Sequence, residues 1–252
     1  MAALFISDLH IDATRPQVLT GLQRLLGTLD DDIDAVYILG DLVEVWVGDD
    51  DDGPTAVAIR DTLGRAAQRR AVHVMHGNRD FLFGARFAAE TGVALLEDPA
   101  VIEVDGERVL IAHGDAYCTR DLAYQKAREQ LRSKAWQAGV LAMSLIDRRA
   151  LAAGLRARSI AANENKAANI MDVTPRAIEE AMDAADVKLM VHGHTHRPGI
   201  HSLTGGRRRI VLGDWHRCGW KLTLAPGDAN LSCFALPMAG RQRSAPPLTS
   251  GS

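Results

Sequence analysis

The stretch "ALFISDLH", residues 3–10, joins a short apolar run to two residues with metal-binding side chains. Four further apolar runs, rich in β-branched residues, are followed in the same way by Asp, Asn or His: residues 35–39 by Gly40-Asp41, residues 71–75 by Gly77-Asn78, residues 108–112 by His113-Gly114-Asp115, and residues 187–191 by His192-Gly193-His194-Thr195-His196. Each run has the length of a β-strand, and sites in α/β folds gather beyond the carboxyl ends of strands. We therefore expect five strands to end on one edge that holds carboxylates, imidazoles and an amide.

The spacing of apolar residues around these runs predicts an α+β fold. Pro16 opens an amphipathic helix that runs to Leu29, and further helices are expected near residues 55–69 and 81–91. Asp105-Gly106 separates two strand-like runs and predicts a two-residue hairpin turn. The stretch 199–236 is again strand-like. Together these signals predict a mixed sheet or β-sandwich flanked by helices.

Residues 120–170 interrupt the pattern, because they carry almost no strand signal and predict three helices. Residues 120–166 contain ten Lys or Arg against four Asp or Glu, and they include the apolar stretch "AWQAGVLAMSLI", residues 135–146. The insertion is either an ordinary helical surface or a lid that holds an anionic, apolar ligand or touches an anionic lipid surface. We expect one domain over residues 1–238 with this insertion, and a disordered tail over residues 239–252.

Composition and charge exclude several classes of protein. The net charge of −3 gives no indication of a nucleic-acid partner. The three cysteines are widely spaced and lack a CxxC pair, which argues against a disulfide framework or a cysteine zinc site. The sequence shows no signal peptide and no apolar stretch of transmembrane length. We expect a cytosolic protein, free or on a membrane surface.

The acidic run 49–52 follows a predicted strand end closely enough to border the site.

Two pairs of candidate ligands have a spacing that suits one ion each. Asp8 and His10, and likewise His194 and His196, are two residues apart, so both members can face one side of a strand or of a loop bent around the ion. Taken singly, such an Asp is usually a cap or turn residue, and such a His is usually a hydrogen-bonded core residue. Five blocks in one chain, each after a predicted strand, are much harder to explain in that way.

Three more candidates complete the set. Asp41 can contact two cations because a carboxylate has two oxygens, Asn78 offers an amide oxygen, and His113 offers an imidazole. The set is large enough for two ions about 3.5–4 Å apart, the spacing of dinuclear hydrolases. Because it contains no cysteine, it suits Mn, Fe or Zn.

The motifs D-x-H, G-D, G-N, H-G-D and G-H-x-H, in this order, resemble those of the calcineurin-like metallophosphoesterases over about residues 5–215. The resemblance implies a β-sandwich flanked by helices and a dinuclear centre. One ion would be held by Asp8, His10, Asp41 and His196. The other would be held by Asp41, Asn78, His113 and His194.

Arg79 departs from that family, many of whose members have a histidine after the G-N pair as proton donor to the leaving group. An arginine cannot act as an acid near neutral pH, but it can clamp a phosphate. A phosphate leaving group, whose final pKa is about 6, tolerates the loss of the acid better than an alkoxide does. Arg79 therefore favours cleavage between two phosphates over cleavage of a simple ester.

Longer stretches narrow the resemblance: "FISDLH", "GDLVEVWVGDD", "HGNRDFL", "LIAHGDAYCTRDLAYQ" and "VLGDWH". They resemble a family of bacterial pyrophosphohydrolases that remove UMP from a UDP-linked diacylated glucosamine on the route to lipid A. That resemblance implies water attack on the α-phosphorus, release of 2,3-diacylglucosamine 1-phosphate, two Mn²⁺ ions, and a peripheral position on the cytoplasmic face of the bacterial inner membrane. It also implies that the helical insertion covers the acyl chains.

The same resemblance maps substrate contacts onto seven positions: Asn78, Arg79, Asp121, Ser159, Asn163, Lys166 and His194. We expect Asn78, Arg79 and His194 to stabilise charge on the phosphoryl oxygens. The helical spacing i, i+4, i+7 puts Ser159, Asn163 and Lys166 on one face. Arg156 extends this stripe by one turn, and Tyr124 is added by its position.

Two other functions stay open at this point. The first is another nucleoside-diphosphate pyrophosphatase or phosphodiesterase on the same two-metal core, which needs no apolar lid. The second is a non-catalytic module that binds a membrane surface through basic helices, for which Arg148 and Arg149 are the cations to test. A degenerate scaffold on this fold would lack several metal ligands, and none of the expected set is missing.

Overall fold

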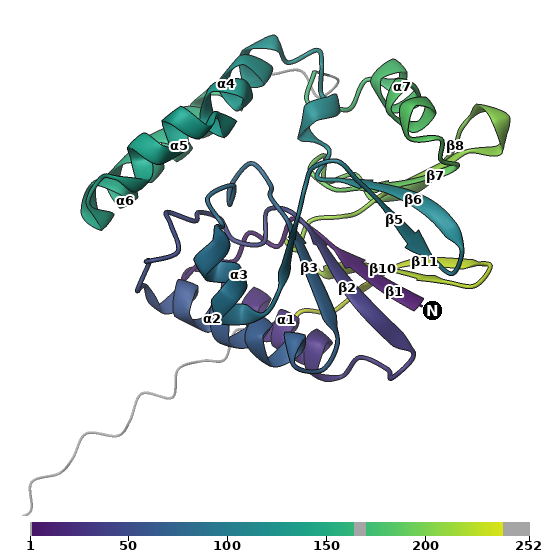
Figure 1. Ribbon diagram of the computed structural model, residues 1–252, viewed down its shortest axis with the longest axis horizontal. Coiled ribbons are helices and arrows are strands. Elements are labelled where there is room, and N and C mark those ends of the chain that lie inside the picture. The colour runs from purple at the N-terminus through teal and green to yellow at the C-terminus, as the bar shows by residue number, and fades with distance from the viewer. Residues whose placement is uncertain (1, 164–169, 239–252) are drawn as a thin grey trace, which may run out of the picture.

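The computed structural model describes residues 2–163 and 170–238, which form two β-sheets packed face to face with helices on both outer faces (Figure 1). This α-β-β-α order of layers confirms the helix-flanked sandwich expected from the sequence. The predicted disordered tail, residues 239–252, lies outside the described residues.

The first sheet has six strands in the order β11-β10-β1-β2-β3-β4. Their bounds are β1 Ala2–Ile6, β2 Ile33–Leu39, β3 Ala71–Met75, β4 Ala94–Leu96, β10 Gly219–Ala225 and β11 Asp228–Phe234. Strands β1 to β4 pair in parallel, whereas β10 and β11 are antiparallel. The parallel strands therefore all end on the same side of this sheet.

The second sheet has five strands in the order β5-β6-β7-β9-β8. Their bounds are β5 Ala100–Val104, β6 Glu107–Ala112, β7 Leu189–His192, β8 Gly199–Ser202 and β9 Arg208–Val211. The turn between β5 and β6 is the predicted two-residue hairpin, with φ of 51° at Asp105 and 80° at Gly106. Positive φ at both positions is the signature of a type I′ turn. Strands β6, β7 and β9 are parallel.

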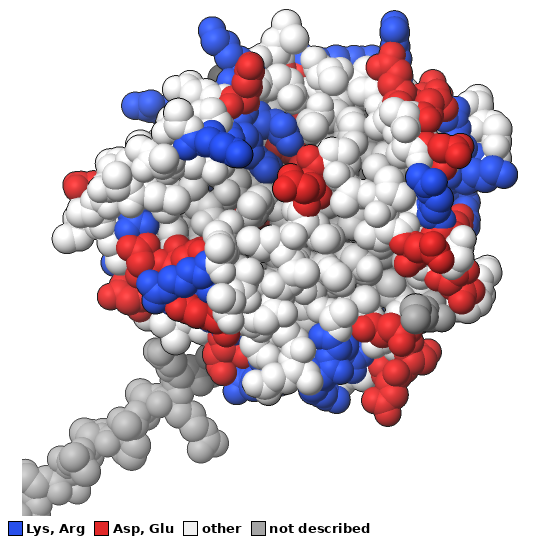
Figure 2. All heavy atoms as spheres, in the orientation of Figure 1, with Lys and Arg blue, Asp and Glu red and all other residues white. Residues whose placement is uncertain are grey.

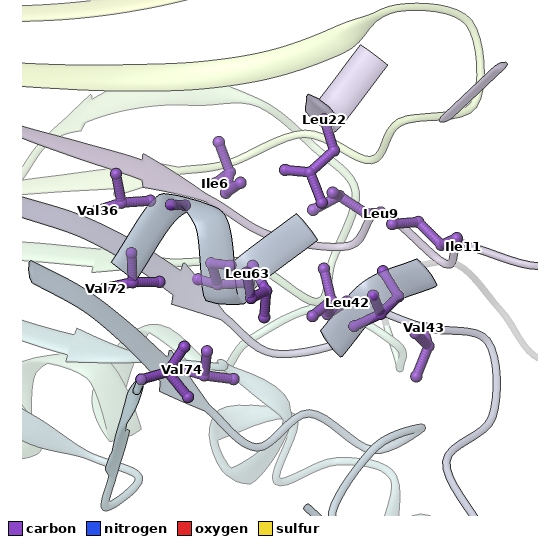
Figure 3. Packing of buried hydrophobic residues seen from close by; sticks show 14 of the residues in the cluster. Ile6, Leu9, Ile11, Leu22, Val36, Leu42, Val43, Leu63, Val72 and Val74 are labelled. Atoms are coloured by element: carbon purple, nitrogen blue, oxygen red, sulfur yellow. The ribbon is translucent and has the colours of Figure 1, made fainter. Parts of the chain in front are cut away.

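The alternating side chains of the first sheet contribute to two separate apolar clusters, one on each face of the sheet. On β1, Leu4 and Ile6 face the helices, whereas Ala3 and Phe5 face the second sheet. Figure 3 shows Leu22 and Leu63 lying over the first sheet among residues of the same apolar cluster. The helices on this side are α1 Pro16–Gly27, α2 Pro54–Ala67 and α3 Ala85–Thr91. Helix α7, Pro175–Ala185, packs on the outer face of the second sheet.

The helix expected over residues 81–91 begins four residues later, at Ala85, so its predicted start was wrong. Gly84 is extended instead, and the carboxylate of Asp49 accepts hydrogen bonds from Gly84 N (3.0 Å) and Phe87 N (2.9 Å). Asp49 thus satisfies free N–H groups at the start of α3. Because the capping carboxylate comes from a residue far away in the sequence, no local signal marks this boundary.

The insertion forms the three predicted helices, α4 Leu122–Arg132, α5 Lys134–Leu141 and α6 Leu145–Asn163, which we call the lid. Figure 1 shows the lid helices together, extending to one side of the two sheets. Asp121 caps α4 by accepting from Tyr124 N at 3.1 Å, and Ser133 caps α5 by accepting from Trp136 N at 3.3 Å. Among the described residues, none of the helices has both the length and the apolar character needed to cross a membrane.

Candidate metal centre and its pocket

The candidate ligands come from two sheets, not from the single edge expected. Asp8, Asp41 and Asn78 follow β1, β2 and β3 of the first sheet, whereas His113 and His194 follow β6 and β7 of the second. The structure nonetheless brings them together, because the sandwich lays the ends of these strands side by side. The centre therefore forms where the two sheets meet.

A left-handed backbone is the conformation shared by most of these residues. The φ angles are 56° at Asp8, 48° at His10, 52° at Asp41, 67° at His194 and 55° at His196. Such values are uncommon for residues other than glycine and cost of order 1–3 kcal/mol each. Strand β1 ends at Ile6, so a bent loop, and not strand alternation, directs Asp8 and His10 to one place.

The first group of ligand atoms comes from Asp8, His10 and His196, all within 4.8 Å of one another. His196 Nε2 lies 3.4 Å from Asp8 Oδ1 and 3.4 Å from His10 Nε2. Asp8 is fully buried, and its Oδ1 accepts no hydrogen bond. A buried carboxylate oxygen and two imidazole nitrogens that face the same point are a donor set suited to a divalent cation.

The second group is centred on Asn78. Its Oδ1 lies 3.1 Å from His113 Nε2 and 2.9 Å from His194 Nδ1. Reversing the amide would satisfy hydrogen bonds among the protein groups alone, whereas a cation at this point requires the oxygen there. We favour the orientation in which Asn78 Oδ1 faces the two imidazoles, because lone pairs of one oxygen and two nitrogens then converge on one point.

Asp41 lies between the two groups. Its Oδ2 is 3.7 Å from His10 Nε2, and its Oδ1 is 3.8 Å from His113 Nε2. Each oxygen of this buried carboxylate therefore faces an imidazole of a different group. This is the geometry that a bridging carboxylate needs.

The two imidazoles of the second group have opposite pKa shifts. Burial alone would lower the pKa of His113, but Asp41 and Asp115 raise it to about 9. Burial and the neighbouring His113 lower the pKa of His194 to about 4. The centre thus attracts positive charge at His113 and keeps His194 neutral, as metal coordination requires.

Groups that the sequence did not single out hold the ligands in place. His113 Nδ1 donates to the carbonyl of Leu39 at 2.9 Å, which directs Nε2 toward Asn78 and the centre. The buried carboxylate of Asp80 accepts from Gly77 N and Leu42 N, both at 2.7 Å. Burial and the charge of Asp41 raise the pKa of Asp80 to about 6. The only local signal for Asp80 is its position two residues after Asn78.

A cavity of about 610 Å³ runs from this centre under the lid. Five of the residues expected to contact substrate line it: Asn78, Arg79, Asp121, Ser159 and His194. Tyr124 and Arg156, added by position, line it as well. Asn163 ends α6, but its side chain and Lys166 lie outside the described part of the chain.

Apolar side chains make up much of the remaining lining. They come from the body and from all three lid helices, and include Val47, Phe81, Leu131, Trp136, Val140 and Leu155. Trp136 packs against Phe81 with ring centroids 5.9 Å apart. One cavity therefore combines candidate metal ligands with apolar side chains and arginines of the lid.

The acidic run 49–52 holds the lid. Arg148, only 4% exposed, donates to the carbonyl of Val47 at 2.7 Å and forms an ion pair with Asp50, and Arg149 pairs with Asp51 and Asp52. Figure 2 shows acidic and basic side chains in contact where this end of the lid meets the body. These arginines are thus engaged in ion pairs that join the lid to the body of the protein.

The H-G-D motif fixes the other end of the lid. Asp115 Oδ2 accepts from Tyr124 Oη at 2.6 Å and from Arg128 Nε at 2.8 Å, both on α4. Burial would raise the pKa of Asp115, but His113, His194 and Arg128 outweigh burial and keep the carboxyl ionised. The third residue of a metal-ligand motif therefore anchors the lid beside the centre.

A model of the calcineurin-like phosphoesterases matches residues 1–198. With the fold and the donor set described above, the chain belongs to this family of metal-dependent hydrolases. Curated proteins named UDP-2,3-diacylglucosamine hydrolase are similar along nearly the whole chain. The protein of Cellvibrio japonicus is 47% identical over 240 residues, which cover 94% of this chain and 98% of that protein. The protein of Aeromonas salmonicida is 45% identical over 243 residues, which cover 94% of this chain and 95% of that protein. Within the larger group, the chain belongs to the UDP-2,3-diacylglucosamine hydrolase family. Both resemblances inferred from the sequence are thereby confirmed.

Proposed function

We propose that the protein hydrolyses the pyrophosphate bond of UDP-2,3-diacylglucosamine, giving UMP and 2,3-diacylglucosamine 1-phosphate. The observation that carries this proposal is the cavity of about 610 Å³, which is lined by the candidate metal ligands, by arginines and by apolar side chains of the lid. The diphosphate of the substrate is anionic and its acyl chains are apolar, so this lining offers contacts to both of its halves. Curated relatives at 40–47% identity carry the name of this activity.

We propose that two divalent cations, Mn²⁺ in the cell, occupy the two groups of ligand atoms. One would be held by Asp8, His10, Asp41 and His196, and the other by Asp41, Asn78, His113 and His194. Such ions polarise the phosphoryl oxygens and lower the pKa of an attacking water. The donor set of His, Asp and Asn, without cysteine, supports an ion of this class.

The protein's own groups would position the diphosphate and stabilise its charge. Arg79 lines the cavity beside Asn78, and its backbone N donates to Asp41 Oδ1 at 2.8 Å, which fixes the start of its side chain at the centre. Its guanidinium can hold phosphoryl oxygens of the reacting group. The leaving phosphate needs no proton from a histidine, because its final pKa is about 6. Tyr124, whose ring centroid is 5.9 Å from that of His194, brings the lid into contact with the centre.

The test is release of UMP from UDP-2,3-diacylglucosamine with Mn²⁺ present, with Asp41→Ala as the inactive control. We expect the intact protein to release UMP and Asp41→Ala to release none. If the intact protein gives no UMP, the proposal is wrong. If UDP-glucosamine without acyl chains is hydrolysed equally well, a general nucleoside-diphosphate pyrophosphatase explains the centre better.

We further propose that the protein works on the cytoplasmic face of the inner membrane, where a diacylated substrate resides. The turn between α5 and α6, with the helix ends beside it, offers apolar side chains to such a surface: Leu141 is 45% exposed, Met143 37% and Ile146 77%. Replacing Met143 and Ile146 with Ser should weaken sedimentation with vesicles of anionic phospholipid. Val57→Ser, at a residue of α2 that is 50% exposed, is the matched control. Equal sedimentation of both variants would contradict a role for this turn.

A further inference from the structure

Glu44 links the lid to a candidate metal ligand. It lies three residues after Asp41, with 18% of its side chain exposed. Its Oε2 is 3.1 Å from His10 Nδ1, and its Oε1 is 2.5 Å from Arg156 Nε on α6. One half-buried carboxylate therefore touches a residue of the metal centre on one side and a lid helix on the other.

The backbone around Glu44 is tied to the same loop that carries His10. Glu44 N donates to the carbonyl of Ile11 at 3.1 Å, and Ile11 N donates to the carbonyl of Leu42 at 3.0 Å. The carboxylate is consequently held at a fixed distance from His10. The contact with Arg156 joins this carboxylate to the lid.

Each contact has a distinct effect on the centre. A carboxylate beside His10 Nδ1 keeps the proton on that nitrogen, so the lone pair of Nε2 faces His196 and Asp41. Arg156 shares the same carboxylate, so its position alters the charge that His10 experiences. Neither His10 Nδ1 nor Glu44 Oε1 makes a hydrogen bond at these distances, so both contacts can tighten together when His10 is drawn toward a cation.

We propose that Glu44 is a positioning residue through which metal binding and docking of the lid favour one another. The inference rests on the proposed metal centre. It goes beyond the proposed function because it couples the metal affinity of the centre to the position of the lid. Coupling of this kind is reciprocal: whatever a docked α6 adds to metal affinity, bound metal adds to the docking of α6.

Arg149 supplies a matched control on the same helix. It forms ion pairs with Asp51 and Asp52 near the other end of α6, and these ion pairs do not involve His10 or Glu44. Arg149→Gln therefore loosens the lid without touching the link, whereas Arg156→Gln breaks the link. A merely structural role of the lid would make the two variants behave alike.

The experiment is calorimetric titration of the metal-free protein with Mn²⁺, without substrate. We expect Arg156→Gln to weaken Mn²⁺ binding several-fold, Arg149→Gln to leave it unchanged, Arg156→Lys to restore part of it, and Glu44→Gln to weaken it by about 10-fold or more. Equal affinities in Arg156→Gln and the wild type would overturn the coupling. Circular dichroism of each variant verifies that the fold is retained.

The reciprocal measurement is hydrogen exchange in residues 145–162 with and without Mn²⁺. Metal should slow exchange there in the wild type and in Arg149→Gln, but not in Glu44→Gln. If Mn²⁺ protects α6 equally in Glu44→Gln, the link does not act through this carboxylate. Failure of the wild type to bind Mn²⁺ at all would instead contradict the proposed metal centre, so the two failures are distinguishable.

Discussion

His113 Nε2 and Asp41 Oδ1 lie 3.8 Å apart, although His113 follows a strand of one sheet and Asp41 follows a strand of the other. A cation held by both would fasten the two sheets together at this end of the sandwich. The candidate centre is therefore part of what keeps the layers in register, and its occupancy should be visible in the stability of the whole domain.

Mn²⁺ should raise the thermal midpoint of unfolding. An ion present at 100 times its dissociation constant stabilises the folded state by about 2.7 kcal/mol, because it binds that state preferentially. Removing divalent cations with a chelator should lower the midpoint, and Asp41→Ala should abolish the difference. His201→Ala, at an exposed histidine of β8, should keep it. An Asp41→Ala protein that Mn²⁺ still stabilises fully would contradict the assignment.

Arg79→Ala should lower kcat/KM for UDP-2,3-diacylglucosamine by about 10²–10³, the usual cost of losing one donor to the transition state. Arg79→Lys should recover part of the loss, because it restores the charge without the planar fork. The wild type should also cleave pyrophosphates faster than alkyl phosphomonoesters. The reverse preference would show that Arg79 does not select the leaving group as argued.

Arg148→Ala should loosen the lid at its outer end, since it removes the ion pair with Asp50 and the donor to Val47. We expect KM for the acylated substrate to rise several-fold, with little change in the weak turnover of UDP-glucosamine. Arg86→Gln, which breaks an exposed ion pair with Glu90, should change neither. Steady-state kinetics on both substrates measure these changes in KM and turnover. An equal rise in KM for both would exclude a lid effect on the acyl chains.

Ala152→Phe should narrow the cavity beneath the lid, because Ala152 of α6 lines it. Turnover of substrates with long acyl chains should fall, and that of substrates with short chains should fall less. A series of UDP-2,3-diacylglucosamines of increasing chain length measures this directly. Ala161→Phe, at an exposed position of the same helix outside the cavity lining, is the control. A uniform loss across the series would mean that the chains lie elsewhere.

Asp80→Ala should destabilise the domain, because Gly77 N and Leu42 N lose their acceptor. An unsatisfied buried N–H group costs about 1–3 kcal/mol. Denaturant unfolding in the presence of a chelator separates this effect from metal binding. Asp80→Asn should lose less, because it keeps one acceptor oxygen. A midpoint equal to that of the wild type would show that water replaces the carboxylate.

The strands and the lid helices could be predicted from the sequence because their signals are local. Apolar runs, the Asp105-Gly106 turn and helical spacing each depend on neighbours along the chain. The start of α3 could not be predicted, because its cap comes from Asp49. Likewise the ion pairs of the two arginines at residues 148 and 149 could not be predicted, because only the fold brings the acidic run 49–52 beside them.

The candidate centre shows the same division. Its ligand residues were recognisable from type, spacing and order, which are properties of the sequence. Glu44 and Asp80 act through contacts that the sequence does not reveal, since Glu44 meets Arg156 more than a hundred residues away and Asp80 supports backbone of two separate loops. Residues that position others carry no signature of their own.

The left-handed backbone at Asp8, His10, Asp41, His194 and His196 has a consequence for protein design. Transplanting these side chains onto the ends of regular strands in another scaffold would aim them apart, because regular strands alternate. A graft must carry over the bent turns and the packing that holds them, and the side chains then follow. The transferable unit is a set of backbone conformations.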